Sequence, residues 1–218
     1  MPTMAEEALR YLGAANAGEA LRQKMSSLAA ETARDFPSRY IYRETAVQAD
    51  AFGMRLADAG VTLPGRMAQT MLASCSRAAV LVCTLGARFD AELRMWQARD
   101  MARAAMLDAC GSAGVENGCD AAERAIRAAH PGLYLTDRFS PGYGDLPLSV
   151  QGALLRFTDA GRRLGVTLSE SCLMNPVKTV TAVIGLSDRP QRARIRGCEY
   201  CMMKPRCALR KQGGFCGT

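Results

Sequence analysis

Four cysteines near the end of the sequence are the residues best suited to chemistry. They are Cys198, Cys201, Cys207 and Cys216, in the pattern C-x2-C-x5-C-x8-C. A C-x2-C pair can present two thiolates from one tight turn. Two further thiolates then complete a tetrahedron around zinc or the four corners of an iron–sulfur cube. The array predicts a metal site, because free cysteines without a shared role rarely crowd in this way in a reducing compartment.

The metal itself is left open by the array, since zinc and a 4Fe-4S cluster both accept four thiolates. The spacing favours iron, because zinc ribbons usually carry a second C-x2-C knuckle. From Arg189 onward, eight Lys or Arg stand against one acid, Glu199, so this segment accounts for the net charge of +7. Such charge would raise a cluster's potential and attract an acidic electron donor such as flavodoxin or ferredoxin. Alternatively, it neutralises the thiolates.

A second candidate site is the segment Arg138 to Asp145, which reads Arg-Phe-Ser-Pro-Gly-Tyr-Gly-Asp. Pro141 favours a turn, and Gly142 permits a close approach that a side chain would block. The planar guanidinium of Arg138 suits a carboxylate. Such a loop can grip a small ligand. The alternative is an ordinary surface turn in which Arg138 is solvated and Tyr143 caps the core.

Hydrophobic spacing predicts the elements that position these residues. Two helices begin the chain, a long helical region runs from Phe89 to Ala129, and another helix spans 148–157. Strands are expected at 39–47, 78–85, 133–135, 166–168 and 179–186. This irregular mixture predicts an α+β fold: a single domain with a mostly antiparallel sheet and long helices at 1–187, followed by a short Cys-rich tail at 188–218.

Other features exclude several classes of function. No apolar run is long enough for a membrane helix, and the N-terminal residues lack a secretory signal pattern, so we expect a cytoplasmic protein. No pair of nucleophile and base stands out, and the single histidine, His130, is interpreted as structural. The cysteines outside the tail are expected to be small buried hydrophobes. They are Cys75, Cys83, Cys110, Cys119 and Cys172.

The segment Arg-x2-Pro-Gly-Tyr at 138–143 resembles the AdoMet-binding loop of the activation, or reactivation, domain of cobalamin-dependent methionine synthase. Residues 107–116 (LDACGSAGVE) resemble the long helix of stand-alone relatives of that domain. Residues 176–185 (PVKTVTAVIG) resemble their late strand, and 9–13 (LRYLG) match near the start. The resemblance spans roughly residues 5–187. The family loop continues Pro-Ala-Cys-Pro after its tyrosine, whereas Gly144, Asp145 and Leu146 follow here, so a different pocket floor is expected.

The resemblance implies roles for single residues. Arg138 would hold the carboxylate of AdoMet, with Pro141 and Gly142 shaping the loop. Tyr143 would line the pocket near the sulfonium, where an electron-rich ring attracts the cation. Glu116, on the long helix, is the candidate for the amino group. Gly111, Ser112 and Gly114 on the same helix lower its helix propensity, which indicates either close packing against a neighbouring strand or a ligand passing over the helix.

The resemblance also implies a function. The chain is expected to bind AdoMet and to serve the reductive reactivation of a corrinoid-dependent methyltransferase such as methionine synthase. It would act in trans on the cobalamin carried by that partner, taking part in methyl transfer without a catalytic residue of its own. One alternative is an iron–sulfur electron carrier or sensor that does not bind AdoMet. Another is a zinc-bearing nucleic-acid module, which is disfavoured because the positive charge is confined to the tail.

Overall fold

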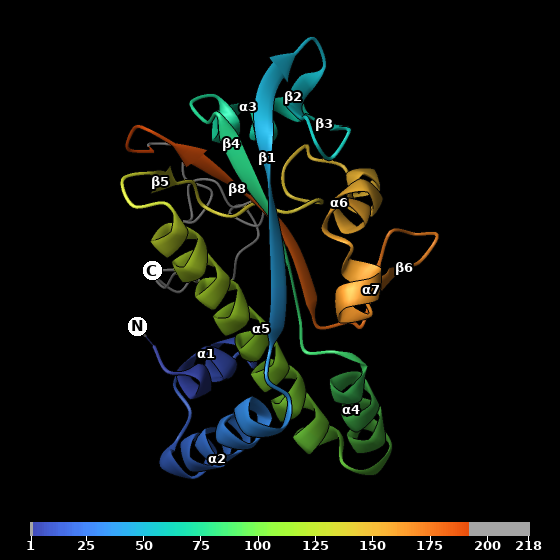
Figure 1. Cartoon of the computed structure of the whole chain (residues 1–218). Coiled ribbons are helices and arrows are strands. Elements are labelled where there is room, and N and C mark those ends of the chain that lie inside the picture. Colours follow the sequence, from blue (N-terminus) through green and yellow to red (C-terminus); the bar gives the residue numbers. More distant parts are fainter. Residues whose placement is uncertain (1, 192–218) are drawn as a thin grey trace. The chain divides into compact units, whose positions relative to one another are not determined.

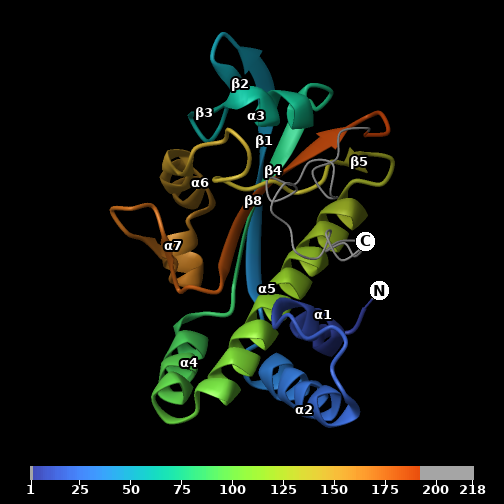
Figure 2. The same cartoon turned by 180° about the vertical axis from the view of Figure 1, so that it is seen from behind.

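A six-stranded sheet and a set of helices make up residues 2–191, the part of the chain that the computed structural model describes (Figures 1 and 2). Strands and helices do not alternate regularly, and the neighbouring strands of the sheet are antiparallel. The predicted α+β class, with a mostly antiparallel sheet and long helices, is confirmed. The four cysteines of the predicted metal site lie outside the described residues.

Contacts divide the chain into two compact units, each built from three segments. The first, called here the helical unit, comprises Met1–Ile41, Leu81–Arg124 and Thr158–Val180. The second, called the sheet unit, comprises Tyr42–Val80, Ala125–Phe157 and the segment that begins at Thr181.

The sheet has the strand order β3-β2-β1-β4-β8-β5. Its strands are β1 (Arg39–Asp50), β2 (Gly53–Leu56), β3 (Val61–Pro64), β4 (Arg77–Thr84), β5 (Tyr134–Leu135) and β8 (Thr179–Ser187). A strand expected at 78–85 is confirmed as β4, and every residue of β4 after Arg77 is buried. The strands expected at 39–47, 133–135 and 179–186 are also present, with ends shifted by a few residues.

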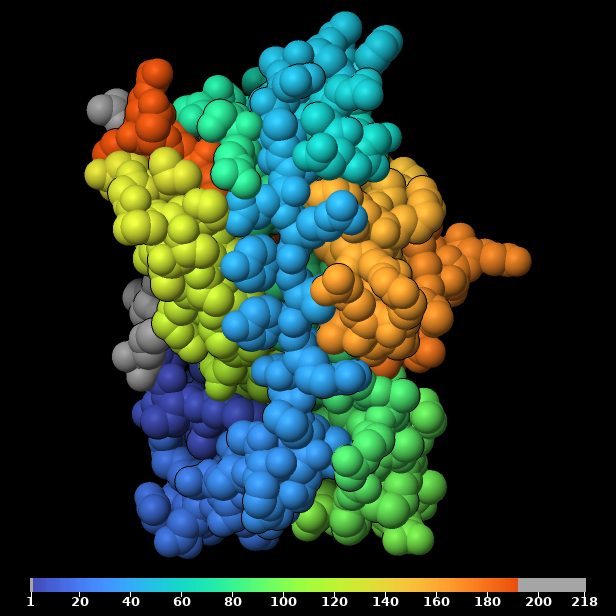
Figure 3. Space-filling view, in the orientation of Figure 1, coloured from blue at the N-terminus to red at the C-terminus, as the bar shows by residue number. Residues whose placement is uncertain are grey.

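Two short strands, β2 and β3, are absent from the sequence prediction. The turn before β2 is held by Asp50, whose Oδ1 accepts hydrogen bonds from the N–H groups of Phe52 (2.7 Å) and Gly53 (2.9 Å). The Thr62 hydroxyl donates to the other carboxylate oxygen of Asp50 at 2.7 Å. A side-chain carboxylate that satisfies turn amides is a common way to start a hairpin. Figure 3 shows this β1–β2 turn and β3, in blue to cyan, at the surface of the sheet unit.

One apolar core fills the sheet unit. It is made by side chains of the strands, of α3 (Gly65–Leu72), and of η1 (Leu148–Val150) with α6 (Gln151–Thr158), where a helix was predicted at 148–157. Burial of each large apolar side chain contributes about 1.5–3 kcal/mol. The members most relevant to the candidate site are Leu63, Leu72, Phe139, Leu146, Leu154 and Val183. The buried side chains of Phe139 and Leu146 therefore anchor the 138–147 loop in this core at two points.

The helical unit contains α1 (Met4–Tyr11), α2 (Glu19–Asp35), α4 (Ala87–Arg99), α7 (Ala160–Leu164) and most of α5 (Met101–Ala129), with the small β6 (Thr167–Leu168) and β7 (Met174–Asn175) pair. A capping box starts α1: the Glu6 N–H donates to the Thr3 hydroxyl, and the Thr3 N–H donates to the Glu6 carboxylate. Such a box satisfies two helix-terminal donors at once. The two predicted N-terminal helices and the strand near 166–168 are confirmed.

The long helical region expected from Phe89 to Ala129 is present, but it is divided into two separate helices, α4 and α5. Asp100 stands between them in an extended conformation, with φ −152° and ψ 99°. Its side chain accepts a hydrogen bond from the Arg103 N–H at 3.1 Å, which satisfies a donor of the first turn of α5. The apolar spacing continues across this break, so periodicity alone does not reveal it.

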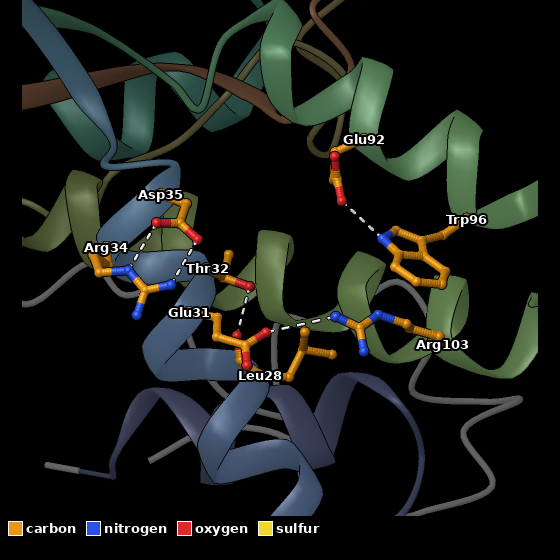
Figure 4. A network of polar contacts seen from close by, with 8 residues as sticks. All are labelled: Leu28, Glu31, Thr32, Arg34, Asp35, Glu92, Trp96 and Arg103. Atoms are coloured by element: carbon orange, nitrogen blue, oxygen red, sulfur yellow. Dashed lines mark hydrogen bonds and ion pairs between the residues drawn. The ribbon is translucent and has the colours of Figure 1, made fainter.

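A polar network connects α2, α4 and α5 within the helical unit (Figure 4). The Arg103 guanidinium lies 4.2 Å from the ring centre of Trp96, the only tryptophan of the chain, and 3.6 Å from the Glu31 carboxylate. The Trp96 Nε1–H donates to Glu92 at 2.8 Å. Contacts of this kind in partly exposed positions stabilise a fold by only about 0–1 kcal/mol each. They nevertheless fix the orientation of the indole.

Candidate functional site

The 138–147 loop, which connects β5 to η1, is anchored at its start to strand β8. The Phe139 N–H donates to the Val183 carbonyl at 3.0 Å, and the Val183 N–H donates back to the Phe139 carbonyl at 2.8 Å. Phe139 is fully buried. Arg138, half-buried, is therefore next to a fixed point of the backbone, which limits where its guanidinium can reach.

Backbone hydrogen bonds fold the next residues into a compact turn. The Tyr143 N–H donates to the Ser140 carbonyl (3.0 Å), the Gly142 N–H to the Leu146 carbonyl (2.8 Å) and the Leu146 N–H to the Tyr143 carbonyl (2.9 Å). Gly142 and Gly144 have φ of 93° and 55°, in the region that favours glycine. The glycines of the predicted loop are thus required by its shape.

The side chains of the turn face different surroundings. Pro141 is buried, whereas Gly142 is exposed and the Tyr143 side chain is 54% exposed. Tyr143 is therefore not part of the buried core. A half-buried arginine and an exposed aromatic ring, five residues apart on an ordered loop, are chemically able to hold a carboxylate and a cationic centre.

Asp145 is the residue of this loop whose importance the sequence analysis missed. Its carboxylate accepts hydrogen bonds from two successive N–H groups at the start of α3: Arg66 to Oδ2 at 2.6 Å, and Met67 to Oδ1 at 2.9 Å. These bonds hold the pKa of Asp145 below its ordinary value, and the charge of Arg66 adds to the effect. The donors lie 79 and 78 residues away in the sequence, so no local pattern signals the contact.

Glu116 lies on α5 and is half-buried. It belongs to the helical unit, whereas the 138–147 loop belongs to the sheet unit. Its assignment to the amino group of a ligand stays a prediction.

The glycines of α5 are explained by close packing within the helical unit. A side chain at Gly111 would overlap the ring of Phe89 from α4, and one at Gly118 would come within 2.6 Å of the Cys83 sulfur of β4. At Gly114 the nearest atom would be the terminal methyl group of Met4, at 3.2 Å. Close packing therefore accounts for Gly111 and Gly118, whereas at Gly114 only the flexible end of Met4 would have to move.

A second polar cluster of the helical unit involves the segment that resembles the family's late strand. The Lys178 ammonium lies 2.9 Å from the Asp108 carboxylate and donates to the Ser112 hydroxyl at 2.8 Å, both on α5. The Val177 N–H donates to Oδ2 of Asp90 at 2.8 Å. Asp90 is only 4% exposed, and within the described residues its Oδ1 has no hydrogen-bond partner. These contacts fix the position of residues 177 and 178, which directly precede β8.

The cysteines of the described residues are not arranged as ligands. Cys75, Cys83, Cys110 and Cys119 are buried, as predicted, whereas Cys172 is partly exposed and departs from the prediction. Desolvation raises the pKa of both Cys75 and Cys110 to about 11, so both are neutral thiols at physiological pH. Among residues 2–191, no group of three or more His, Cys, Asp or Glu side chains is placed to bind a metal.

His130 lies just after α5 in the sheet unit. Its Nε2 is 2.7 Å from a carboxylate oxygen of Glu44 on β1, and both side chains are mostly buried. Arg77 of β4 forms an ion pair with the other oxygen of Glu44. This position, with its partner groups belonging to the sheet, fits the structural interpretation of His130.

No protein-family sequence profile matches the chain, and no curated protein matches it significantly. Among solved structures, it is similar to the crystal structure of the MetH reactivation domain bound to AdoHcy, with a TM-score of 0.61 and 15% sequence identity. The match covers 98% of this chain and 75% of that chain. The chain therefore shares the fold of a methionine synthase reactivation domain. None of the helices in the described part of the chain is both long and apolar enough to cross a membrane.

Proposed function

We propose that this chain binds AdoMet and serves the reductive reactivation of a corrinoid-dependent methyltransferase, such as methionine synthase, in trans. The observation that carries the proposal is the 138–147 loop: an Arg-x2-Pro-Gly-Tyr sequence, ordered at both ends, in a chain that shares the fold of a domain solved with AdoHcy. Neither the loop sequence nor the fold would be sufficient alone, because a fold hosts many functions.

In this proposal, Arg138 pairs with the carboxylate of AdoMet, and Pro141 and Gly142 hold the turn open beside the ligand. Tyr143 presents its exposed ring to the sulfonium, where the negative face of the ring attracts the cation. Glu116 is the proposed partner of the amino group. The chain supplies binding and orientation, while the cobalt of the partner supplies the reactivity.

Reactivation needs one electron and one methyl group. The electron converts cobalt(II) to cobalt(I), and the methyl cation equivalent then passes from AdoMet to cobalt(I), giving methylcobalamin and AdoHcy. In the segment 188–218, Cys198, Cys201, Cys207 and Cys216 would hold either a 4Fe-4S cluster, which would supply one-electron transfer, or zinc, which would not. An acidic donor such as flavodoxin or ferredoxin would supply the electron to the basic segment.

The test is a reactivation assay with the whole chain, purified without oxygen. A corrinoid methyltransferase in the cobalt(II) state is mixed with reduced flavodoxin, AdoMet carrying a labelled methyl group, and this chain. The proposal predicts label on cobalt only when all components are present. If label appears at the same rate without the chain, the reactivation role is wrong.

Metal analysis and nucleic-acid binding on the same preparation separate the other candidates. Iron with sulfide but no AdoHcy binding would indicate an electron carrier or sensor. Zinc with salt-sensitive binding to generic DNA or RNA would indicate a nucleic-acid module.

A further inference from the structure

The start of helix α3 is capped by a residue that is distant in the sequence. The residue at its N-cap position, Pro64, offers no side-chain hydrogen bond, so the first N–H groups of the helix have no local acceptor. The Asp145 carboxylate of the 138–147 loop accepts from two of them, Arg66 and Met67, one with each oxygen. Because helix N-termini carry unsatisfied donors and a partial positive charge, this is a favourable place for a carboxylate.

Small residues on both sides make the contact possible. A side chain at Gly65 would come within 2.6 Å of the Asp145 carboxylate, and one at Gly144 would come within 2.9 Å of the terminal methyl group of Met67. Replacing either glycine would push the loop and α3 apart. The two N–H donors lower the pKa of the carboxylate and so favour its charged form.

The two anchors enclose three of the residues assigned to the ligand, while Arg138 directly precedes the first anchor. Phe139 fixes the loop to β8 by two backbone hydrogen bonds, and Asp145 fixes it to α3. Only Ser140–Gly144 lie between them, and this stretch contains Pro141, Gly142 and Tyr143. A segment of five residues, held at both ends, has few conformations left to lose when a ligand binds.

We propose that Asp145 is a positioning residue that fastens the 138–147 loop to α3 and so presets the loop for AdoMet before the ligand arrives. The inference rests on the proposed function of the loop, and the Asp145 contact itself stands on geometry alone. Asp145 does not touch the ligand in this scheme. It acts through the turn that carries Tyr143 and through the anchored start of the loop at Arg138.

The experiment compares Asp145→Ala, Asp145→Asn and Asp145→Glu with the unaltered chain. AdoHcy affinity is measured by calorimetry, and amide hydrogen exchange is followed at residues 64–69 and 138–148. Loss of a helix cap and of the loop's preset shape predicts about tenfold weaker AdoHcy binding for Asp145→Ala, with faster exchange confined to these two segments. The AdoHcy affinity of Asp145→Asn, which keeps one acceptor oxygen, is expected to lie between those of the unaltered chain and Asp145→Ala. Asp145→Glu is expected to bind AdoHcy more tightly than Asp145→Ala.

Asp50→Ala is the matched control. Asp50 is also an aspartate of the sheet unit that accepts bonds from two backbone N–H groups, Phe52 and Gly53, but in the β1–β2 turn. Its loss should speed exchange in that turn and leave AdoHcy affinity unchanged. An equal loss of affinity in both variants would mean that general destabilisation is the cause, and would overturn the positioning role.

A pH profile adds a readout that a purely structural residue would not give. The lowered pKa means that the contact is fully present above the ordinary aspartate range and is lost as the pH falls through the lowered value. The affinity advantage of the unaltered chain over Asp145→Asn should therefore shrink as the solution is acidified. An advantage that is constant with pH would contradict the role of the charge.

Failure of the two proposals can be told apart. If the unaltered chain does not bind AdoHcy, the proposed function fails, and hydrogen exchange alone then decides whether Asp145 orders the loop. If the unaltered chain binds AdoHcy and Asp145→Ala binds it equally well, the positioning role fails while the proposed function stands.

Discussion

On α5 a side chain at Gly111 would overlap the Phe89 ring, whereas in the 138–147 loop Gly144 is exposed and adopts a left-handed backbone with φ 55°. The first glycine makes room for a neighbouring helix, and the second makes a turn that ends in a charged contact with α3. Both segments are glycine-rich and both resemble the same family. The glycine on the helix is thus required by packing, and the glycine in the loop is required by the backbone conformation of the turn.

The largest effect on stability is expected on the packing side, from Gly111→Ala. The new methyl group must displace Phe89, which is fully buried, and overpacking of this kind costs about 1–3 kcal/mol. The free energy of unfolding from urea denaturation, followed by Trp96 fluorescence, measures it. Gly114→Ala is the control: the flexible end of Met4 can yield, and the gain in helix propensity of up to about 1 kcal/mol should remain. Equal destabilisation by the two substitutions would contradict the packing account.

In the 138–147 loop, Gly144→Ala is expected to lower the free energy of unfolding less than Gly111→Ala does. It is expected to weaken AdoHcy binding more than Gly111→Ala does. An L-residue in the left-handed region costs about 1–2 kcal/mol, and the methyl group also meets Met67. Gly60→Ala is the control, because Gly60 has φ 60° in the same unit but no atom within 4 Å of the added methyl group. Both variants should lose stability, and only Gly144→Ala should lose AdoHcy affinity in calorimetry. Unchanged affinity in Gly144→Ala would remove the loop from the ligand site.

The smallest effect is expected for chemical modification of the buried thiols in the folded chain. With a pKa of about 11 for Cys75 and Cys110, only about one thiol in a thousand is ionised at pH 8. Iodoacetamide at pH 8, read by mass spectrometry, should therefore label the partly exposed Cys172 of the folded chain well before Cys75 or Cys110. Equal labelling of all three would show that the packed regions open readily.

The same two thiols predict a decline in stability in alkali. Their pKa is raised in the folded state, so folding keeps a proton that the unfolded chain releases near pH 9. Stability is fully present below that pH and is lost as the pH rises towards about 11. Replacing both residues by Ala should flatten this part of the stability profile.

The sequence predicts the fold best where one physical signal dominates. The strand expected from the mostly apolar run at 78–85 is found as β4. The break between α4 and α5 is missed because apolar periodicity continues through Asp100, although an aspartate three residues before Arg103 is a possible cap signal. The short strands β2 and β3 are missed because four residues give too weak a period-two pattern.

The candidate site is predictable only in its local part. Arg138 to Tyr143 are adjacent in sequence, so their residue types and the two turn-forming residues are enough to suggest a ligand loop. The Asp145 contact with Arg66 and Met67 joins residues almost 80 positions apart, and no spacing rule reaches that far. Cys198, Cys201, Cys207 and Cys216 lie outside the described residues, so the metal site stays a prediction.

Calorimetric titration of AdoHcy into the unaltered chain, Arg138→Gln and Arg156→Gln tests whether the 138–147 loop binds AdoMet. Arg156 is exposed on α6 in the same unit, so its substitution controls for lost positive charge. We predict saturable binding of one AdoHcy per chain, about tenfold or more weaker in Arg138→Gln through loss of the carboxylate pair, and unchanged in Arg156→Gln. No binding by the unaltered chain, or equal affinity in all three proteins, would contradict the assignment of this loop to AdoMet.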